Sequence, residues 1–353
     1  MKKGEKTEVM AKERNAYFDN MKALLIFLVV LGHVLSNFAG DDSVGDWIYL
    51  VIFSFHMPAF LFVTGYFARS DPKKVIGQLL ILYLIFQTAQ EVIDYVVMLI
   101  KDPEHAFFDF QLFFPMWTLW YLLAMILYNI LLPVFDTDDR RKQVRNVIIA
   151  FAMGMIISCS VGTDNFLAAN RVVTFLPFYL TGYYGKSNGT VKDYLSNRKK
   201  ILSREHMKWK ISALVIAGVM MAVLWFTRDL WNPEWFFGTY SYVDTSLTPW
   251  IKALCYLLAY LWIFVLLIFV PKRRLGYLTR IGQNTLGIYL FHGVALRILR
   301  EIPAVTELTE KSLLLCFLLA AVLTWLLSFD CVSGLLKKIR IPDSHIAAAK
   351  NGT

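Results

Sequence analysis

Ten apolar segments, each about as long as a membrane-spanning helix, constrain how this chain folds more than any other feature. The apolar core of a bilayer is ~30 Å thick, so a helix needs about 20 residues to cross it. Several segments are short, contain Pro or Gly, or carry polar side chains, as helices that line a protein interior do. The segments are residues 22–38, 47–67, 75–99, 118–135, 144–162, 170–185, 209–227, 248–270, 281–299 and 311–336.

The composition favours a membrane protein over a soluble one. Apolar residues make up 57% of the 353 residues and charged residues only 18%, whereas about 25% charged is usual in soluble domains. One soluble domain of this length does not bury so much apolar surface, and the same composition excludes a disordered chain. We therefore predict an all-α, polytopic integral membrane protein with about ten transmembrane helices. The predicted membrane domain covers residues 22–336, between an N-terminal segment, 1–21, and a C-terminal tail, 337–353.

Lys and Arg residues are distributed unevenly over the connections between these segments. With the N-terminus on the cytoplasmic side, the cytoplasmic connections carry 28 of the 36 basic residues and the opposite ones carry six. Cytoplasmic loops of membrane proteins are enriched in Lys and Arg. We therefore predict a multi-pass protein of the cytoplasmic membrane with both termini inside. Because the net charge of +9 follows from this topology, we expect no nucleic-acid partner.

Three of the six His residues are expected inside the membrane at a similar depth. His33 lies 11 residues after Lys22, and His292 lies 11 residues into its segment, both counted from the cytoplasmic side. At ~1.5 Å per residue this is ~16 Å, close to the bilayer midplane. His56 lies nine residues into its segment, counted from the opposite side. We therefore expect the three imidazoles to converge.

Imidazoles at one depth are consistent with two kinds of chemistry. Three His side chains can hold zinc, but the sequence has no His-x-x-x-His pair and no Cys at ligand spacing, so we predict no metal. An imidazole also acts as a general base or nucleophile near neutral pH, and we favour this interpretation. The alternative is a structural role, in which each His is bonded to a neighbouring helix.

Asp19 and Lys22 lie three residues apart at the start of the first segment. This spacing places both on one face of a helix, where they are expected to form an ion pair. The alternative is ordinary anchoring at the membrane interface.

Several stretches resemble membrane acyltransferase family three, whose relatives include the fucose 4-O-acetylase type and other exopolysaccharide O-acetyltransferases. That family carries a basic residue, ten further residues and a His in its first helix, and Lys22 and His33 have this spacing. Lys22 stands where many members have Arg. The stretches are RNAYFDNMKALLIFLVVLGH (14–33), FHMPAFLFVTGY (55–66), WTLWY (117–121), residues 171–182, and GQNTLGIYLFH (282–292).

The resemblance implies a membrane-embedded O-acyltransferase. Such an enzyme moves an acyl group, in most relatives acetyl, from cytoplasmic acyl-CoA to a hydroxyl of a cell-surface or lipid-linked glycan. It implies a catalytic site with Lys22, His33 and His292, in which His33 deprotonates the hydroxyl or briefly carries the acyl group.

The donor phosphates are expected to bind basic residues on the cytoplasmic face, although for any single one of these residues a role in topology alone is the favoured alternative. Some family members carry Arg-x-x-Arg in a cytoplasmic loop, whereas the one such pair here, Arg297 and Arg300, falls on the predicted outer side. The donor candidates are Arg69, Lys73, Lys74, Arg140 and Arg141.

The acceptor glycan is expected to enter from the other side of the membrane. A polar stripe at helical spacing, Gln87, Gln90 or Glu91, and Asp94, is one wall of this acceptor site. The same stripe serves equally well to seal one helix against another. The acceptor candidates are Asp19, His56, Glu91, Asp94, Trp117, Trp120 and Arg171.

Two other functions fit some of these features. Ten spans with His and acidic residues near the midplane also describe a proton-coupled transporter. Transporters tend to have two related halves, and the likeness between residues 63–67 and 180–184 is too short to establish a duplication. A membrane scaffold without an active site fits poorly with three intramembrane His residues.

The charge distribution predicts the side of the membrane on which each connection lies. A reporter fused after Lys200 should be active in the cytoplasm, and one fused after Asp42 should be active outside it. The measurement is a paired reporter assay that detects both compartments. The opposite reading at either position would contradict the predicted topology.

Overall fold

The computed structural model describes residues 15–38, 43–68, 73–159, 166–201, 207–243 and 245–339, excluding the side chains of residues 73, 74, 198–201 and 337. These residues form helices and connecting loops, with no strand among them. The α-helices are α1 (Ala16–Phe38), α2 (Ser43–Phe53), α3 (His56–Phe67), α4 (Lys73–Lys101), α5 (Trp120–Phe135), α6 (Arg140–Ile157), α7 (Ala169–Ser187), α8 (Thr190–Ile201), α9 (Lys208–Phe226), α10 (Pro249–Phe269), α11 (Tyr277–Gln283), α12 (Thr285–Leu299), α13 (Pro303–Glu310), α14 (Leu313–Leu327) and α15 (Asp330–Ile339). Short 3-10 helices cover Phe166–Ala168, Arg228–Leu230 and Pro233–Phe236.

Five helical segments of the described chain are long and apolar enough to cross a membrane. They are Ala16–Ser36, Ser43–Phe67, Val75–Lys101, Lys208–Phe226 and Pro249–Phe269. The bent pair Leu313–Leu327 and Asp330–Leu336 brings the number to as many as six, and two apolar helices, Trp120–Phe135 and Thr285–Leu299, are shorter. The all-helical prediction is confirmed, while the number of ten spans and the orientation of the termini stay predictions.

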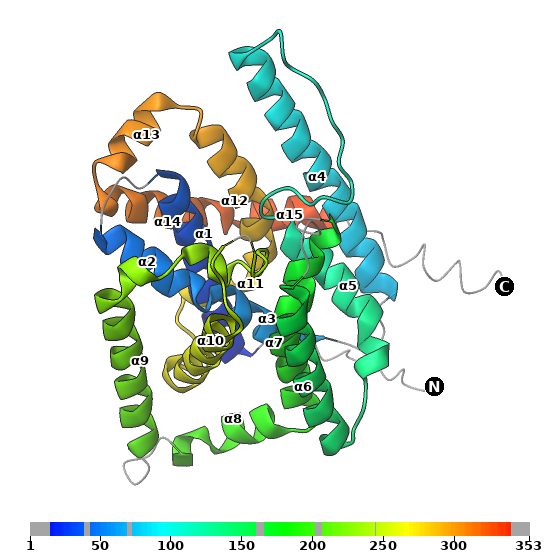
Figure 1. Ribbon diagram of the computed structural model, residues 1–353, viewed down its shortest axis with the longest axis vertical. Coiled ribbons are helices and arrows are strands. Elements are labelled where there is room, and N and C mark those ends of the chain that lie inside the picture. Colours follow the sequence, from blue (N-terminus) through cyan, green and yellow to red (C-terminus); the bar gives the residue numbers. More distant parts are fainter. Residues whose placement is uncertain are drawn as a thin grey trace, which may run out of the picture.

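Each predicted apolar segment contains a helix, but three of them are interrupted. The segment 47–67 breaks between α2 and α3, and 281–299 breaks at Asn284 between α11 and α12. The last segment bends by 59° between α14 and α15. The polar stretch between the sixth and seventh segments contains α8, which crosses between the ends of α7 and α9 (Figure 1).

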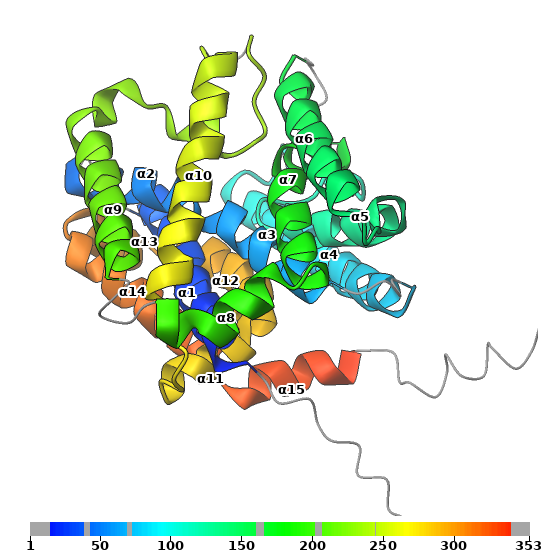
Figure 2. The same ribbon diagram turned by 90° about the horizontal axis from the view of Figure 1, so that it is seen from below.

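Helix α1 lies in the middle of the molecule. It packs against α2, α3, α11, α12 and α14 (Figures 1 and 2). Its apolar side chains are buried almost all the way round, among them Phe18, Leu25 and Val30, which have no exposed surface. An α-helix that is apolar on all sides is stable only when it is surrounded by other apolar groups, and α1 therefore organises the core.

The closest backbone contact of α1 is with α11. A Cβ atom at Gly282 would lie 1.7 Å from the Asp19 carbonyl oxygen, so only glycine permits this approach. The contact fixes the beginning of α1, which carries Asp19 and Lys22, against the break between α11 and α12.

Helices α3 and α7 cross at two glycines. A Cβ atom at Gly65 would lie 1.9 Å from the Tyr179 carbonyl oxygen, and one at Gly182 would lie 1.9 Å from the Phe62 carbonyl oxygen. The two short stretches that resemble each other in sequence, 63–67 and 180–184, therefore pack against one another. Small residues permit the same close approach of helices in other membrane proteins.

This crossing predicts a stability effect at a single position. Gly65→Ala should destabilise the protein by about 1–3 kcal/mol, because the added methyl group overlaps backbone rather than a movable side chain. The matched control is Gly218→Ala in α9, where an added Cβ meets nothing within 4 Å and alanine favours the helix. The measurement is the midpoint of thermal unfolding in detergent. Equal midpoints for the two variants would contradict the close crossing.

Candidate active-site cavity

One face of α1 lines an interior cavity of about 420 Å³. Its four lining residues on this helix are Lys22, Ile26, Val29 and His33. Their spacing of four, three and four residues is the spacing of a single helical face. Lys22 and His33 are therefore separated by ~16 Å along the helix axis, at 1.5 Å per residue, and the cavity extends from one to the other.

The remaining walls come from α3, α4, α5, α7 and α12 and are mainly apolar. Several of the polar groups in them are hydrogen-bonded, whereas the Tyr179 hydroxyl and Thr118 Oγ1 have no partner among the described residues. The hydroxyls of Thr64 and Tyr121 are 2.7 Å apart. The Tyr289 hydroxyl donates to the Thr118 carbonyl oxygen at 2.6 Å and accepts from the Leu122 N–H at 3.2 Å. These bonds hold the walls in place because polar groups in an apolar interior are costly without partners.

At one end of the cavity, Lys22 forms an ion pair with Asp19 at 2.8 Å. This confirms the predicted pair. The Gln283 amide donates to the other carboxylate oxygen of Asp19 at 3.2 Å. Lys186 donates to the carbonyl oxygen of Ala68, a lining residue, at 3.1 Å. Lys186 is not part of the lining, but this bond brings a second ammonium group to the edge of the cavity.

At the other end, His33 and His292 lie against each other. Their ring centroids are 5.5 Å apart and the rings are stacked. Trp117 contacts His33 edge-on, with 4.6 Å between centroids. His56 is one aromatic ring further away, because Phe53 lies between it and His33. The structure thus brings two of the three His residues together directly and the third indirectly.

Hydrogen bonds orient two of these imidazoles. Nδ1 of His292 lies 2.6 Å from the Tyr289 carbonyl oxygen, and Nδ1 of His56 lies 2.8 Å from that of Ile52. A carbonyl oxygen only accepts, so Nδ1 carries the hydrogen in each ring, and Nε2 of the neutral ring is an acceptor. Nε2 of His292 is buried and has no hydrogen-bond partner in the described part of the chain. This nitrogen is therefore available as a hydrogen-bond acceptor.

Arg171 and Trp120 lie together near this end. The Arg171 guanidinium is 5.2 Å from the centre of the Trp120 ring, and its Nε donates to the Thr239 hydroxyl at 2.8 Å. Trp120 also lines the cavity. His292, His56 and Arg171 are all close enough to act electrostatically on His33.

The polar stripe of α4 is largely engaged in internal bonds. Glu91 Oε1 accepts from the Gln87 amide at 2.7 Å and from the Gln111 N–H at 3.0 Å. Asp94 forms an ion pair with Arg297 of α12. These contacts agree with the alternative in which the stripe seals α4 against its neighbours.

Two residues of this stripe and a neighbouring Thr still have polar atoms without a partner. Gln90 Nε2, Glu91 Oε2 and Thr118 Oγ1 are buried and have no hydrogen-bond partner among the described residues. Two of them surround Gly293, where a Cβ atom would lie 2.7 Å from Thr118 Oγ1 and 3.5 Å from Gln90 Nε2. Gly293 directly follows His292. Buried polar atoms usually have a partner, so this region suits a small hydroxyl-bearing group or water.

None of the expected donor-binding residues is seen to line the cavity in the described part of the chain. Arg140 and Arg141 are exposed at the start of α6 and do not line the cavity. Arg69 lies outside the described residues, as do the side chains of Lys73 and Lys74. Among the described residues no group of three or more His, Cys, Asp or Glu has a geometry that holds a metal ion.

A protein-family model described as an acyltransferase domain matches residues 15–333. Among curated proteins, nodulation protein NolL of Sinorhizobium fredii is 30% identical over 163 residues, which are 42% of this chain and 44% of NolL. The match thus spans less than half of the relative's length. No solved structure matches the chain.

The bonds of Glu91 predict a local change in stability. Glu91→Ala should loosen the connection between α4 and α5 at Gln111, because a hydrogen bond to a charged group contributes about 1.5–3 kcal/mol. Protease cleavage within residues 102–119 should then be at least about tenfold faster. Glu104→Ala, at an exposed residue of the same connection, is the control. Equal cleavage rates would favour the acceptor role of Glu91 over the sealing role.

Proposed function

The chain belongs to the acyltransferase family whose domain model matches residues 15–333, and from this premise we propose a membrane-embedded O-acyltransferase. Its donor is a cytoplasmic acyl-CoA, with acetyl as the first acyl group to test, and its acceptor is a hydroxyl of a cell-surface or lipid-linked glycan. The observation that carries this proposal is the face of α1 that connects Lys22 to His33 along a single cavity.

The dimensions of the cavity support an acyl-CoA donor. The pantetheine arm of coenzyme A has a backbone about as long as four extended amino-acid residues, or ~14 Å, and the cavity follows α1 for ~16 Å. The arm carries little charge and suits the mainly apolar walls. With its thioester beside His33, the arm would pass Lys22 at the other end, and the charged nucleotide would stay outside the cavity.

The chemistry that we propose at His33 is transfer from a thioester to an alcohol. His33 takes the proton of the acceptor hydroxyl, the oxygen attacks the thioester carbonyl carbon, and the carbon–sulfur bond breaks. The sulfur leaves as a thiolate and takes the proton back from the imidazolium, so that an ester and free coenzyme A result. General-base assistance of this kind contributes about 10²–10⁴-fold in rate.

His33 also fits a second route, in which its nitrogen attacks the thioester first and carries the acyl group until the alcohol takes it. In both routes His33 is the reacting group. The stacked ring of His292, held by its bond to the Tyr289 carbonyl oxygen, positions His33. Nε2 of His292 is the second place where the proton can go.

The acceptor is proposed to bind where the aromatic rings meet the His33 end. Trp117 is 37% exposed and provides a ring face on which a sugar can pack, whereas the Trp120 ring is covered by Phe175 and by the Arg171 guanidinium, which provides a cation at this end. Glu91 and Asp94 are less favoured than the sequence suggested, because both are engaged in internal bonds. Because Asp19 pairs with Lys22, we propose that it belongs to the donor end rather than to the acceptor site.

The membrane arrangement is part of the proposal. We infer ten spans, both termini inside and a location in the cytoplasmic membrane from the distribution of basic residues. Arg69, Lys73, Lys74, Arg140 and Arg141 then lie on the donor side as candidates for the first encounter with the nucleotide. Since the family is one of acyltransferases, no observation here favours the transporter alternative.

The role of His33 predicts a loss of turnover without loss of folded protein. His33→Gln keeps the size of the side chain but cannot take a proton, so turnover from acetyl-CoA should fall about 10²–10⁴-fold. The assay uses purified protein in lipid nanodiscs, labelled acetyl-CoA and a panel of lipid-linked and surface glycans. His105→Gln, at an exposed loop residue, is the matched control.

A large loss of turnover and near-normal turnover of His33→Gln lead to different conclusions. Near-normal turnover of His33→Gln would show that His33 is structural, and His292 would become the better candidate for the reacting group. His292→Ala should cost less than His33→Gln if His292 only positions its neighbour.

A further inference from the structure

A second cavity of about 800 Å³ lies beside the first. It is formed by the approach to α11, by α11 itself, by the start of α12 and by α15. Unlike the first cavity, it is lined mostly by polar side chains, among them Arg274, Tyr277, Arg280, Gln283, Asn284 and Ser333. Its chemistry suits a charged, hydrogen-bonding ligand.

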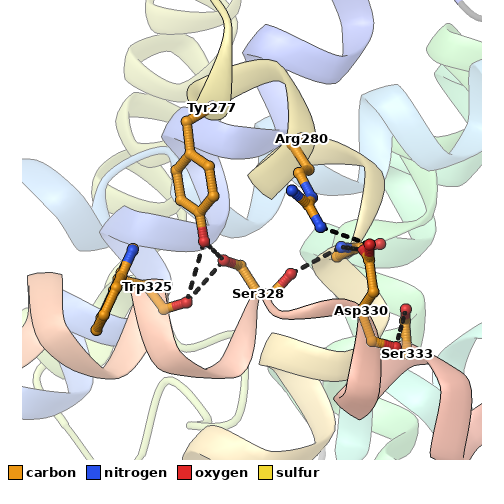
Figure 3. Close-up of polar contacts among 7 residues, drawn as sticks. Tyr277, Arg280, Trp325, Ser328, Asp330 and Ser333 are labelled. Atoms are coloured by element: carbon orange, nitrogen blue, oxygen red, sulfur yellow. Dashed lines mark hydrogen bonds and ion pairs between the residues drawn. The ribbon is translucent and has the colours of Figure 1, made fainter.

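One wall of this second cavity is held by a polar network that Figure 3 shows. Arg280 pairs with Asp330, and the Asn284 amide donates to the Ser328 carbonyl oxygen at 2.7 Å and to Asp330 at 3.2 Å. The hydroxyls of Tyr277 and Ser328 are 2.7 Å apart. These contacts tie α11 and α12 to the 59° bend between α14 and α15. The wall is therefore preorganised around the guanidinium of Arg280.

The two cavities meet at the break between α11 and α12. Leu286 lines both of them, Asn284 lines the second and Thr285 lines the first. Gln283 lines the second cavity and donates to Asp19, the partner of Lys22. The polar cavity and the Lys22 end of the apolar one are therefore neighbours that share Leu286.

The balance of charge in the second cavity is positive. Arg280 is paired with Asp330, whereas Arg274 is exposed and makes no ion pair or side-chain hydrogen bond among the described residues. Guanidinium groups bind phosphate with two parallel hydrogen bonds, and one unpaired and one preoriented Arg face the same cavity. Tyr277 adds an aromatic ring beside them.

We propose that this second cavity binds the nucleotide of the acyl-CoA donor, with Arg274 and Arg280 on its phosphates. The pantetheine arm then crosses Leu286 into the first cavity. The proposal rests on the acyl-CoA donor of the proposed function and adds where the nucleotide binds. In this arrangement the main phosphate contacts come from the connection before α12 and not from the basic loops that were expected from the sequence.

The test compares two donors that differ only in the nucleotide. Acetyl-CoA carries it and S-acetylpantetheine lacks it. In nanodiscs of neutral phosphatidylcholine, which supply no anionic headgroup, Arg274→Ala should raise KM for acetyl-CoA about tenfold, since a charged hydrogen bond contributes about 1.5 kcal/mol or more. KM for S-acetylpantetheine should stay unchanged. Arg273→Ala is the matched control, because Arg273 is exposed, adjacent and not part of the lining.

A binding measurement separates this proposal from the proposed function. Adenosine 3′,5′-bisphosphate, the nucleotide half of coenzyme A, should bind the wild type and the Arg273→Ala variant and bind Arg274→Ala about tenfold more weakly. If the wild type bound it in this way but transferred acetyl from neither donor, the acyltransferase proposal would fail and the nucleotide site would stand. Unchanged binding and unchanged KM in Arg274→Ala, or an equal rise in KM for both donors, would overturn the site.

A variant of Arg280 gives a second test, which is independent of Arg274→Ala. Arg280→Gln keeps a side chain that can bond to Asp330 but removes the charge. It should also raise KM for acetyl-CoA and leave KM for S-acetylpantetheine unchanged. A loss of folded protein in this variant would leave Arg274→Ala, which breaks no described contact, to decide the proposal.

Discussion

The close approach of α1 to α11 is the contact on which the rest of the structure depends. It requires Gly282, because any side chain there would overlap the backbone of Asp19. The contact sets the rotation of α1, so that Lys22, Ile26, Val29 and His33 face one cavity. It also holds the break between α11 and α12 at the end of that cavity, where a second, polar cavity begins. One backbone contact thus places both cavities next to each other.

Polar groups in an interior of this kind have to be paired or have to bind something else. The ion pairs of Asp19 with Lys22 and of Asp94 with Arg297 belong to the first group. The unpaired Nε2 of His292 belongs to the second, as do the free polar atoms around Gly293. In the proposed reaction they would serve as a proton acceptor and as a site for a hydroxyl. The distinction separates residues that hold helices together from residues that suit a substrate.

Much of the candidate site was predictable because helical spacing is a local property. The interval between Lys22 and His33 places both on one helical face whatever surrounds the helix, and the pair of Asp19 with Lys22 follows in the same way. Arg274, Arg280 and Lys186 were not predictable as site residues. Their sequence neighbourhood is an ordinary basic loop. Only the packing of α11 near α15 brings Arg274 and Arg280 to the second cavity, and Lys186 reaches Ala68 because α7 packs against α3. The polar stripe of α4 fitted two roles, and its partners in the 102–119 connection, distant in sequence, favour the sealing one.

The sequence by itself determined the helical class, the positions of the apolar segments and the periodicity that joins Lys22 to His33. These depend on composition and on the geometry of a single helix, which neighbouring residues define. The tertiary structure decided which helices touch. It stacked His33 on His292, placed Phe53 between His33 and His56, and packed residues 63–67 against 180–184 through Gly65 and Gly182. It decided these contacts because they join residues far apart in the chain, and helix packing depends on the shapes of both partner surfaces at once.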